Sequence, residues 1–470
     1  MVLNKTSVDR TSRAFFIGES RFPDFELISN YQLKELPATA IGHVPGSTLF
    51  SRLLEQGLIV SSRLRSGLSE DEEKALTAMQ VGIDAMAFHG PECFVDMEDL
   101  ARARGVAPEK FTLGIGQRQM AVVTPCEDTV TMAALAGRKA LQAFDIDPSE
   151  IGTLIVGTET GVDHSKPVAV YVHELLGLPT TCRTFETKHA CYGAMAGLTS
   201  ASDWIVAGRA RGRKALIIAS DIARYGLNTP GEPTQGAGAV AMVVSDNPRL
   251  LTFDSSLEGD YTRQVMDFWR PLYSKYAFAD GHYSIECYLD ALSACWTDAL
   301  NKADGQREAF ELNALDASFY HVPFTKMAKK AHQRHWEVEL GRAIERDSED
   351  AVRVSASYQQ RVEPWLSLNA VVGNIYTGSL FLSLIDYLRR ASSEHSGRPV
   401  SLFSYGSGCG AAFSVARVSD GADRFNAAID PTEHLANRRR LSIEDYEALI
   451  VAADQADQNE AEEVDPADWG

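Results

Sequence analysis

The chain has 470 residues, of which 45% are hydrophobic and 23% charged, a composition typical of a large globular protein. Its net charge of −19 argues against broad nucleic-acid binding, because such proteins present a basic face to phosphates. No apolar run approaches the about 18 residues of a membrane span. Seven cysteines without a CxxC pair or a signal peptide indicate a reducing, cytoplasmic compartment.

The first 78 residues show no clear alternation of strands and helices and are predicted to be an N-terminal extension of unknown role. A strand is expected at 81–88 and a helix at 95–104, and Met79, just before that strand, is a candidate start of the functional chain. Further strands are expected at 153–157, 215–220 and 237–245, and helices at 129–144, 168–176 and 192–207.

The alternation continues in the second half with helices at 283–302 and 378–390 and a strand at 400–405. Strands alternating with helices predict an α/β fold with packed sheets. Eleven histidines form no HExxH cluster, so no metal is predicted; His332 and His335 are expected on an exposed helix surface. Residues 451–470 are rich in Asp and Glu and are predicted to be an acidic, disordered tail.

Cys191 is the most informative residue, because small residues typical of a helix start follow it and a short predicted strand at 182–186 precedes it. The positive end of a helix dipole favours the thiolate and lowers the pKa of a thiol placed there. This setting suits a covalent nucleophile, whereas an isolated cysteine is more often a small buried core residue.

Other polar segments support the nucleophile interpretation because several follow predicted strands, where α/β proteins build their sites. Glu127 stands just before an apolar helix. The remaining polar segments are 157–167, 221–225, 266–271, 320–326, 373–377 and 404–408.

In this order and at these separations, the segments resemble the 3-hydroxy-3-methylglutaryl-CoA (HMG-CoA) synthase family of the thiolase-fold superfamily, from about Val81 to about Leu449. The resemblance implies an α/β, thiolase-like fold with two pseudo-duplicated halves in α-β-α-β-α layers. We place the halves at residues 79–245 and 246–450. The extension 1–78 and the tail 451–470 fall outside the resemblance.

The resemblance also implies condensation of acetyl-CoA with acetoacetyl-CoA, followed by hydrolysis to HMG-CoA, in a cytoplasmic homodimer of the mevalonate pathway that needs no cofactor. Carried over by motif, Cys191 takes the acetyl group, Glu127 is the general base, and His321 polarises the second substrate and assists proton transfer.

Substrate-binding roles carry over in the same way. Asn374 would donate a hydrogen bond to the acetoacetyl group, and the backbone N–H groups of Cys191 and Ser407 would form an oxyanion hole. Lys326 and Lys330 match positions along a CoA channel, although both also suit a solvated helix face. Further expected site residues are Tyr192, Asp221, Tyr225, Asp267 and Tyr376.

Three alternatives stay open. Relatives that install β-branches on polyketides use acyl carrier protein in place of CoA, and residues 171–177 suit either group. A decarboxylating ketoacyl-synthase-like enzyme would need Cys, His and Asn but no carboxylate base, and an inactive homologue would serve as a scaffold. The family commonly has Asn-Ala-Cys-Tyr-Gly-Gly, but this chain has His189 and Ala194, which leaves substrate preference open.

Overall fold

The structure is a computed structural model that describes residues 80–303, 311–425 and 430–459. The predicted extension 1–78 and the last part of the predicted tail, 460–470, lie outside the described residues.

The described strands of the first half form one side of a nine-stranded sheet in the order β5-β4-β6-β7-β1. Most are nearly continuous Val, Ile and Ala runs that are buried on both faces, as expected of a sheet covered by helices on each side. Strand β4 is parallel to β5 and β6, and β7 is antiparallel to β6 and β1. Their bounds are β1 Gly82–His89, β4 Ile151–Gly157, β5 Arg183–Thr187, β6 Lys214–Ile222 and β7 Ala237–Ser245.

The second half continues the sheet in the order β8-β13-β12-β11. Strands β11 and β12 are parallel, whereas β13 is antiparallel to β12 and β8. The two halves join through a short pairing of Gly82 with Thr252 and Ile83 with Leu251. The strands are β8 Leu251–Thr262, β11 Ala317–Tyr320, β12 Pro399–Gly406 and β13 Gly410–Val418.

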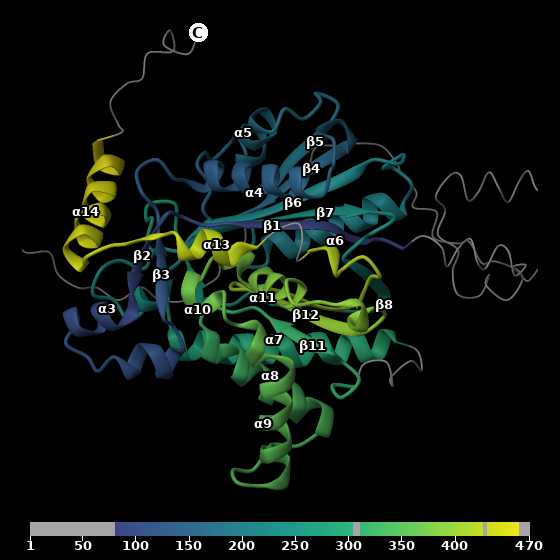
Figure 1. Ribbon diagram of the computed structural model, residues 1–470. Coiled ribbons are helices and arrows are strands. Elements are labelled where there is room, and N and C mark those ends of the chain that lie inside the picture. The colour runs from purple at the N-terminus through teal and green to yellow at the C-terminus, as the bar shows by residue number, and fades with distance from the viewer. Residues whose placement is uncertain (1–79, 304–310, 426–429, 460–470) are drawn as a thin grey trace, which may run out of the picture. The chain divides into compact units, whose positions relative to one another are not determined.

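Helices form the remaining layers (Figure 1). Helix α4 (Thr129–Ala143) covers the outer face of the first half together with α5 (Val168–Leu175). Helices α6 (Gly193–Val206) and α11 (Ser379–Leu388) lie in the middle, and every residue of α11 is buried. Helices α7 (Gly281–Lys302) and α8 (Thr325–Leu340) cover the second half. The predicted α-β-α-β-α layering is confirmed.

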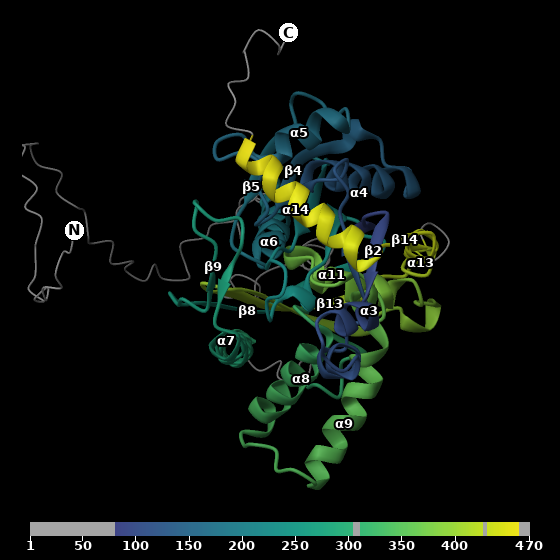
Figure 2. The same cartoon turned by 90° about the vertical axis from the view of Figure 1, so that its left-hand side faces the viewer.

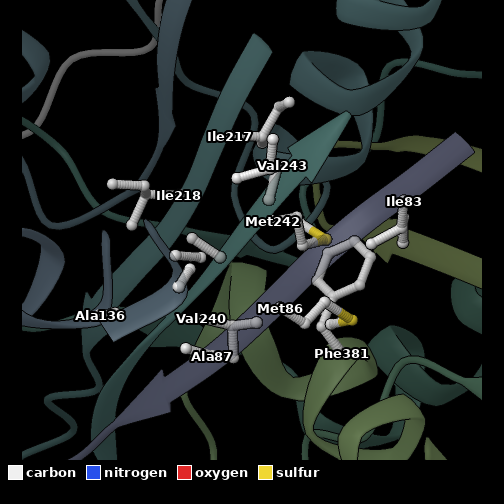
Figure 3. Packing of buried hydrophobic residues seen from close by; sticks show 14 of the residues in the cluster. Ile83, Met86, Ala87, Ala136, Ile217, Ile218, Val240, Met242, Val243 and Phe381 are labelled. Atoms are coloured by element: carbon white, nitrogen blue, oxygen red, sulfur yellow. The ribbon is translucent and has the colours of Figure 1, made fainter. Parts of the chain in front are cut away.

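The hydrophobic core binds the two halves together (Figure 3). Phe381 of α11, in the second half, lies close to Met86 of β1, in the first half. The same cluster includes side chains of β6, β7 and α4: Ile217, Ile218, Val240, Met242, Val243 and Ala136. Packing α11 against both halves fixes the strand ends of one half relative to those of the other.

A smaller layer sits beside the main sheet. It contains a three-stranded sheet in the order β14-β2-β3, with helix α3 (Met97–Ala103) and the long helix α14 (Ile443–Asn459) (Figure 2). Its strands are β2 Cys93–Asp96, β3 Gln119–Val122 and β14 Arg439–Arg440. The remaining elements include β9 Phe268–Trp269, β10 Phe278–Ala279, α9 Glu349–Arg361, α10 Asn369–Val372 and α13 Pro431–Ala436.

Two sequence-based boundaries differ from the structure. Residues 93–96 form strand β2, and Asp96 then caps α3 by accepting a hydrogen bond from the backbone N–H of Glu98, so the helix begins later than predicted. The predicted disordered tail is helical up to Asn459. There Asp454 accepts a hydrogen bond from the Tyr276 hydroxyl at 2.7 Å and forms an ion pair with Lys275.

The prediction of an exposed histidine pair is wrong, because His332 and His335 are both fully buried. The hydroxyl of Tyr320 lies 3.0 Å and 2.9 Å from their Nδ1 atoms. Ala328, Ala331 and Trp336 share the buried face of α8, so this face packs on β11, and Tyr320 supplies the polar partner that buried imidazoles need. Burial lowers the pKa of His332 to about 3.

Within the three described stretches, no helix combines the length and apolar character needed to cross a bilayer. The same residues contain no group of three or more His, Cys, Asp or Glu side chains placed to hold a metal ion.

Candidate active site

Cys191 lies on the turn between β5 and α6, close to the end of β4. This close approach requires glycine: a Cβ on Gly157, the last residue of β4, would lie 2.4 Å from the backbone N of Ala194. Ala190 has a left-handed φ of 42°, an uncommon conformation for a residue with a side chain. Such strain is often found beside functional groups, and here it precedes the candidate nucleophile.

The carboxylate that meets Cys191 belongs to Glu159. The Sγ atom of Cys191 donates to Oε1 of Glu159 at 3.4 Å, and only 6% of the Glu159 side chain is exposed. Burial and the nearby Asp221 raise the pKa of Glu159 to about 8. A carboxyl group with this pKa is suited to general acid and base catalysis near neutral pH.

The thiol of Cys191 is not pre-ionised, contrary to the expectation drawn from the helix dipole. Burial and the negative charges of Glu159 and Asp221 raise its pKa well above the usual value. The structure therefore provides a protonated thiol with a base in contact, rather than a free thiolate.

Asp221, at the end of β6, connects the Glu159 loop to the second half of the molecule. Its Oδ1 accepts hydrogen bonds from the backbone N–H groups of Glu159 and Thr160, and its Oδ2 accepts one from the backbone N–H of Thr377. The hydroxyls of Thr158, Thr160 and Thr377 complete this set of donors. Asp221 is fully buried, and its hydrogen bonds fix the backbone that carries Glu159.

Tyr225, Tyr376 and Asn374 form a wall beside the nucleophile. Burial and the charges of Cys191 and Glu159 raise the pKa of Tyr225, which hydrogen-bonds to Tyr376 and Asn374. Oδ1 of Asn374 accepts from the backbone N–H of Tyr376 and from the Ser379 hydroxyl, both at 2.9 Å. Those two bonds orient the amide and leave its NH₂ group directed to the site.

His321 follows β11 and is held by its backbone. Its N–H donates to the carbonyl of Phe403 at 2.8 Å, and its carbonyl accepts from the Tyr288 hydroxyl at 2.9 Å. Burial lowers the pKa of His321 to about 3, so the imidazole is neutral. A neutral imidazole donates one hydrogen bond and accepts another.

The end of β12, next to β11, packs directly on the Cys191 turn. A Cβ on Gly406 would lie 2.3 Å from the carbonyl oxygen of His189 and 2.7 Å from the backbone N of Tyr192. The following turn, which contains Ser407, is fixed by Asp267: its Oδ1 accepts from the N–H of Gly408 and its Oδ2 from the Tyr405 hydroxyl. The strand ends of both halves therefore converge on Cys191.

Two family models match this chain: "Hydroxymethylglutaryl-coenzyme A synthase N terminal" over residues 77–248, and the corresponding C-terminal model over 251–355 and 339–463. The chain belongs to the hydroxymethylglutaryl-CoA synthase family. One relative, the hydroxymethylglutaryl-CoA synthase of Enterococcus faecalis, is 40% identical over 79% of this chain and 92% of its own. The Bacillus subtilis polyketide biosynthesis 3-hydroxy-3-methylglutaryl-ACP synthase PksG is 32% identical over 79% and 88%.

Solved structures of the family confirm the thiolase-like fold. MvaS in complex with HMG-CoA superimposes with a TM-score of 0.76 at 47% identity, covering 79% of this chain and 91% of that chain. The curacin pathway HMG synthase in complex with acetyl donor-ACP gives a TM-score of 0.72 at 34% identity, covering 79% and 88%.

Glu127 does not occupy the position that the sequence analysis gave it. Its Oε2 accepts from the N–H and hydroxyl of Thr124 at 2.8 and 2.9 Å, and its Oε1 accepts from the N–H of Glu92 at 2.9 Å. These bonds fix the loop before α4 and tie it to Glu92, between β1 and β2. Helix α4 covers the outer face of the sheet, whereas α6, which follows Cys191 in the chain, lies on its inner face (Figure 1). The geometry does not support the prediction of Glu127 as the general base.

A better signal for the base was present in the sequence. Glu159 comes two residues after the buried strand that ends at Gly157, the position where α/β proteins place site residues. Sequence reasoning also missed Arg270, whose Nη2 lies 3.9 Å from Oε2 of Glu159. Phe268 completes the aromatic wall, with its ring centroid 6.2 Å from those of Tyr225 and Tyr376.

The remaining expected site residues lie around this centre. Tyr192 is the N-cap residue of α6, and its ring lies perpendicular to that of His189, with the ring centroids 5.6 Å apart. Lys326 is half-buried and Lys330 exposed, both near the start of α8. Neither lysine forms an ion pair with any residue that the structure describes. His189 packs against Gly410, where a Cβ would lie 2.4 Å from its ring.

Proposed function

We propose that this protein is an HMG-CoA synthase that condenses acetyl-CoA with acetoacetyl-CoA and releases HMG-CoA. The observation that carries the proposal is the 3.4 Å contact between the Cys191 thiol and the buried Glu159 carboxyl group, within a chain of this family. The site residues below are part of the same proposal, with Glu159 taking the role that the sequence analysis gave to Glu127.

Acetylation begins when ionised Glu159 takes the thiol proton of Cys191 and the sulfur attacks the thioester of acetyl-CoA. The base accelerates this step, because burial and the neighbouring carboxylates raise the pKa of the thiol. The CoA thiolate leaves and takes the proton from Glu159, which is thereby ionised again, and the acetyl group stays on Sγ as a new thioester.

Glu159 next removes a proton from the methyl group of the acetyl thioester. Negative charge then develops on the thioester oxygen, and the backbone N–H groups of Cys191 and Ser407 would stabilise it. By analogy with other oxyanion holes, each such donor contributes about 3–4 kcal/mol. The resulting carbon nucleophile attacks the ketone of acetoacetyl-CoA.

The ketone oxygen becomes an alkoxide during this attack and needs donors. The neutral imidazole of His321 and the amide of Asn374 supply hydrogen bonds, and protonated Glu159 supplies the proton. His321 acts as a hydrogen-bond donor rather than as an acid, because its pKa of about 3 leaves the ring neutral at physiological pH. Water then cleaves the thioester to Cys191, and no step calls on a metal or prosthetic group.

CoA is the proposed carrier of both substrates. MvaS in complex with HMG-CoA is 47% identical to this chain, whereas the curacin HMG synthase is 34% identical. Lys326 and Lys330, without ion-pair partners among the described residues, suit the phosphates of CoA. Acyl carrier protein is the second candidate, because the curacin enzyme has been solved in complex with its donor-ACP.

Intact-protein mass spectrometry distinguishes CoA from acyl carrier protein as the donor of the acetyl group. Acetyl-CoA should add one acetyl group, mapped to Cys191, within the mixing time. Acetylation from an acetylated carrier protein alone would transfer the assignment to polyketide β-branching. If neither donor acetylates the protein, the inactive-scaffold reading gains support and the proposed function fails.

We further propose that the protein is a homodimer. Strand β5 is an edge of the described sheet, paired only with β4. Apolar side chains on the flanking segments are exposed, among them Val162 at 48%, Val170 at 40% and Val206 at 46%. An exposed edge strand beside apolar side chains favours association of two copies. Light scattering of the purified protein should give twice the mass of the chain, and a monomer would refute this.

A further inference from the structure

Arg270 is a cation in the candidate active site whose hydrogen-bonding capacity is not used by the residues that the structure describes. It follows strand β9, and its guanidinium faces Glu159, with Nη2 and Oε2 separated by 3.9 Å. Only 17% of its side chain is exposed. No hydrogen bond joins the guanidinium to any residue in 80–303, 311–425 or 430–459, so its five N–H donors lack a close protein acceptor.

The segment that carries Arg270 is anchored on both of its faces by neighbouring residues. Asp267, three residues earlier, is fully buried and bonded to Gly408 and Tyr405. Phe268 packs edge-on against Tyr225 and Tyr376. A guanidinium carried on such an anchored segment, close to the reacting atoms and free to donate, is arranged as a receptor for an anion.

The largest charge effects on Cys191 come from carboxylates. Glu159, Asp221 and Asp267 all act on the thiol, and Asp221 and Asp267 are fully buried. A further carboxylate formed at Cys191 would be repelled unless a cation met it. Arg270 is the described cation that acts on Glu159.

Hydrolysis, the last step of the proposed function, creates such a carboxylate. The oxygen of water bonds to the thioester carbonyl carbon, the bond from that carbon to Sγ breaks, and Sγ takes a proton from water. The new carboxylic acid then loses its proton to Glu159 or to solvent. Neither substrate carries a carboxylate in its acyl group, so this anion appears first at the sulfur of Cys191.

We propose that Arg270 binds the carboxylate formed at Cys191, and that this site therefore selects CoA thioesters whose acyl group ends in a carboxylate. The guanidinium exchanges its long ion pair with Glu159 for a bidentate pair with the product. The inference rests on the proposed function and adds a product-recognition residue to it.

The test compares two acyl-CoA ligands that differ at one end. Glutaryl-CoA ends in a carboxylate where pentanoyl-CoA ends in a methyl group. Both are titrated by calorimetry into protein carrying Cys191→Ala, which prevents acylation, with Arg270 intact, Arg270→Gln or Arg270→Lys. Arg263→Gln, at an exposed position on the preceding loop, is the matched control.

With Arg270 intact, glutaryl-CoA should bind about tenfold or more tightly than pentanoyl-CoA, since one charge-assisted pair distinguishes them. Arg270→Gln should abolish that preference and leave pentanoyl-CoA affinity within about twofold, which also shows that the fold is intact. Arg270→Lys should retain part of the preference, because the charge remains and the bidentate geometry is lost. Arg263→Gln should behave like the parent protein.

The inference is overturned if Arg270→Gln leaves the glutaryl-CoA preference unchanged, or if it weakens both ligands equally. Failure of the proposed function looks different. In that case the protein with Cys191 intact takes no acetyl group from acetyl-CoA, whatever Arg270 does in the binding experiment.

Discussion

Glu127 and Glu159 lie in two loops of the first half that each lead from a strand toward a helix. In the loop before α4, both oxygens of Glu127 accept hydrogen bonds from neighbouring backbone, and the side chain is half-buried. In the loop after β4, Glu159 is buried, its own backbone N–H is held by Asp221, and its carboxyl group contacts the Cys191 thiol. A carboxylate can serve as a base when its backbone is held by other groups, its oxygens remain available, and burial opposes its charge.

Substitution of Cys191, whose thiol contacts Glu159, is expected to lower turnover more than any other change considered below. Cys191→Ala should lower turnover by about 10⁴-fold or more, because no acetyl thioester can form. The check is radiolabelled acetyl-CoA followed by recovery of the protein. Cys126→Ala, an exposed cysteine beside Glu127, is the matched control and should stay labelled. Label retained by Cys191→Ala would refute the nucleophile.

Substitution of Glu159 and of Glu127 should give the next largest difference in turnover. Glu159→Gln is expected to lower steady-state turnover by about 10²–10⁴-fold, the usual contribution of a positioned general base. Glu127→Gln should stay within about threefold of the parent protein, because among the described residues its oxygens bond only to Thr124 and Glu92. Equal losses in both variants would remove the distinction between the loops.

The hydrogen bonds that hold the Glu159 loop can be weakened without changing its carboxyl group. Asp221→Asn loses acceptor capacity toward the backbone N–H groups of Glu159 and Thr377, and should lower kcat about tenfold or more with little change in KM. Steady-state kinetics measures both constants, and thermal unfolding reports the accompanying loss of stability. An unchanged kcat would show that Asp221 does not position the base.

The pH dependence of the condensation rate should follow the ionisation of Glu159 and not that of Glu127. Its pKa of about 8 means that the basic form is depleted as pH falls, so the rate of condensation should drop about tenfold per unit well below pH 8. Arg270 lowers this pKa, so Arg270→Gln should move the inflection to higher pH. Glu127→Gln should leave the inflection in place. A profile without an inflection near 8 would contradict the assignment.

The smallest effect concerns stability. Glu127→Ala removes the acceptor for two donors of Thr124 and for the backbone N–H of Glu92, and should lower the free energy of unfolding by about 1–2 kcal/mol. Urea unfolding measures the change, with Asp128→Ala, which removes the cap of α4, as a comparison of similar size. An unchanged free energy of unfolding in Glu127→Ala would show that Glu127 does not stabilise its loop.

Much of the fold could be predicted because buried strands appear in the sequence as local apolar runs. The run at 237–245, for example, coincides with β7. Motif order also indicated the segments that surround Cys191. Non-local partners were harder to predict. The donors that engage Glu127 include the backbone of Glu92, 35 residues away, and the hydroxyl that satisfies His332 and His335 comes from Tyr320 on another element.

The ionisation state of Cys191 was mispredicted for the same reason. The helix dipole is a local feature of the sequence, whereas the opposing effect comes from burial and from carboxylates that the fold brings together from three separate segments. Arg270 lies in the segment 266–271 that the sequence analysis included, but nothing in its sequence neighbourhood pairs it with Glu159, more than a hundred residues earlier.

The central claim is that Glu159, and not Glu127, removes the methyl proton of the acetyl group on Cys191. The most direct test is hydrogen–deuterium exchange into that methyl group in D₂O, followed by mass spectrometry of the acetylated peptide. Acetylated Glu159→Gln should retain its methyl protons, and acetylated Glu127→Gln should exchange them at the parent rate. Exchange that persists in Glu159→Gln, or stops in Glu127→Gln, would contradict the account.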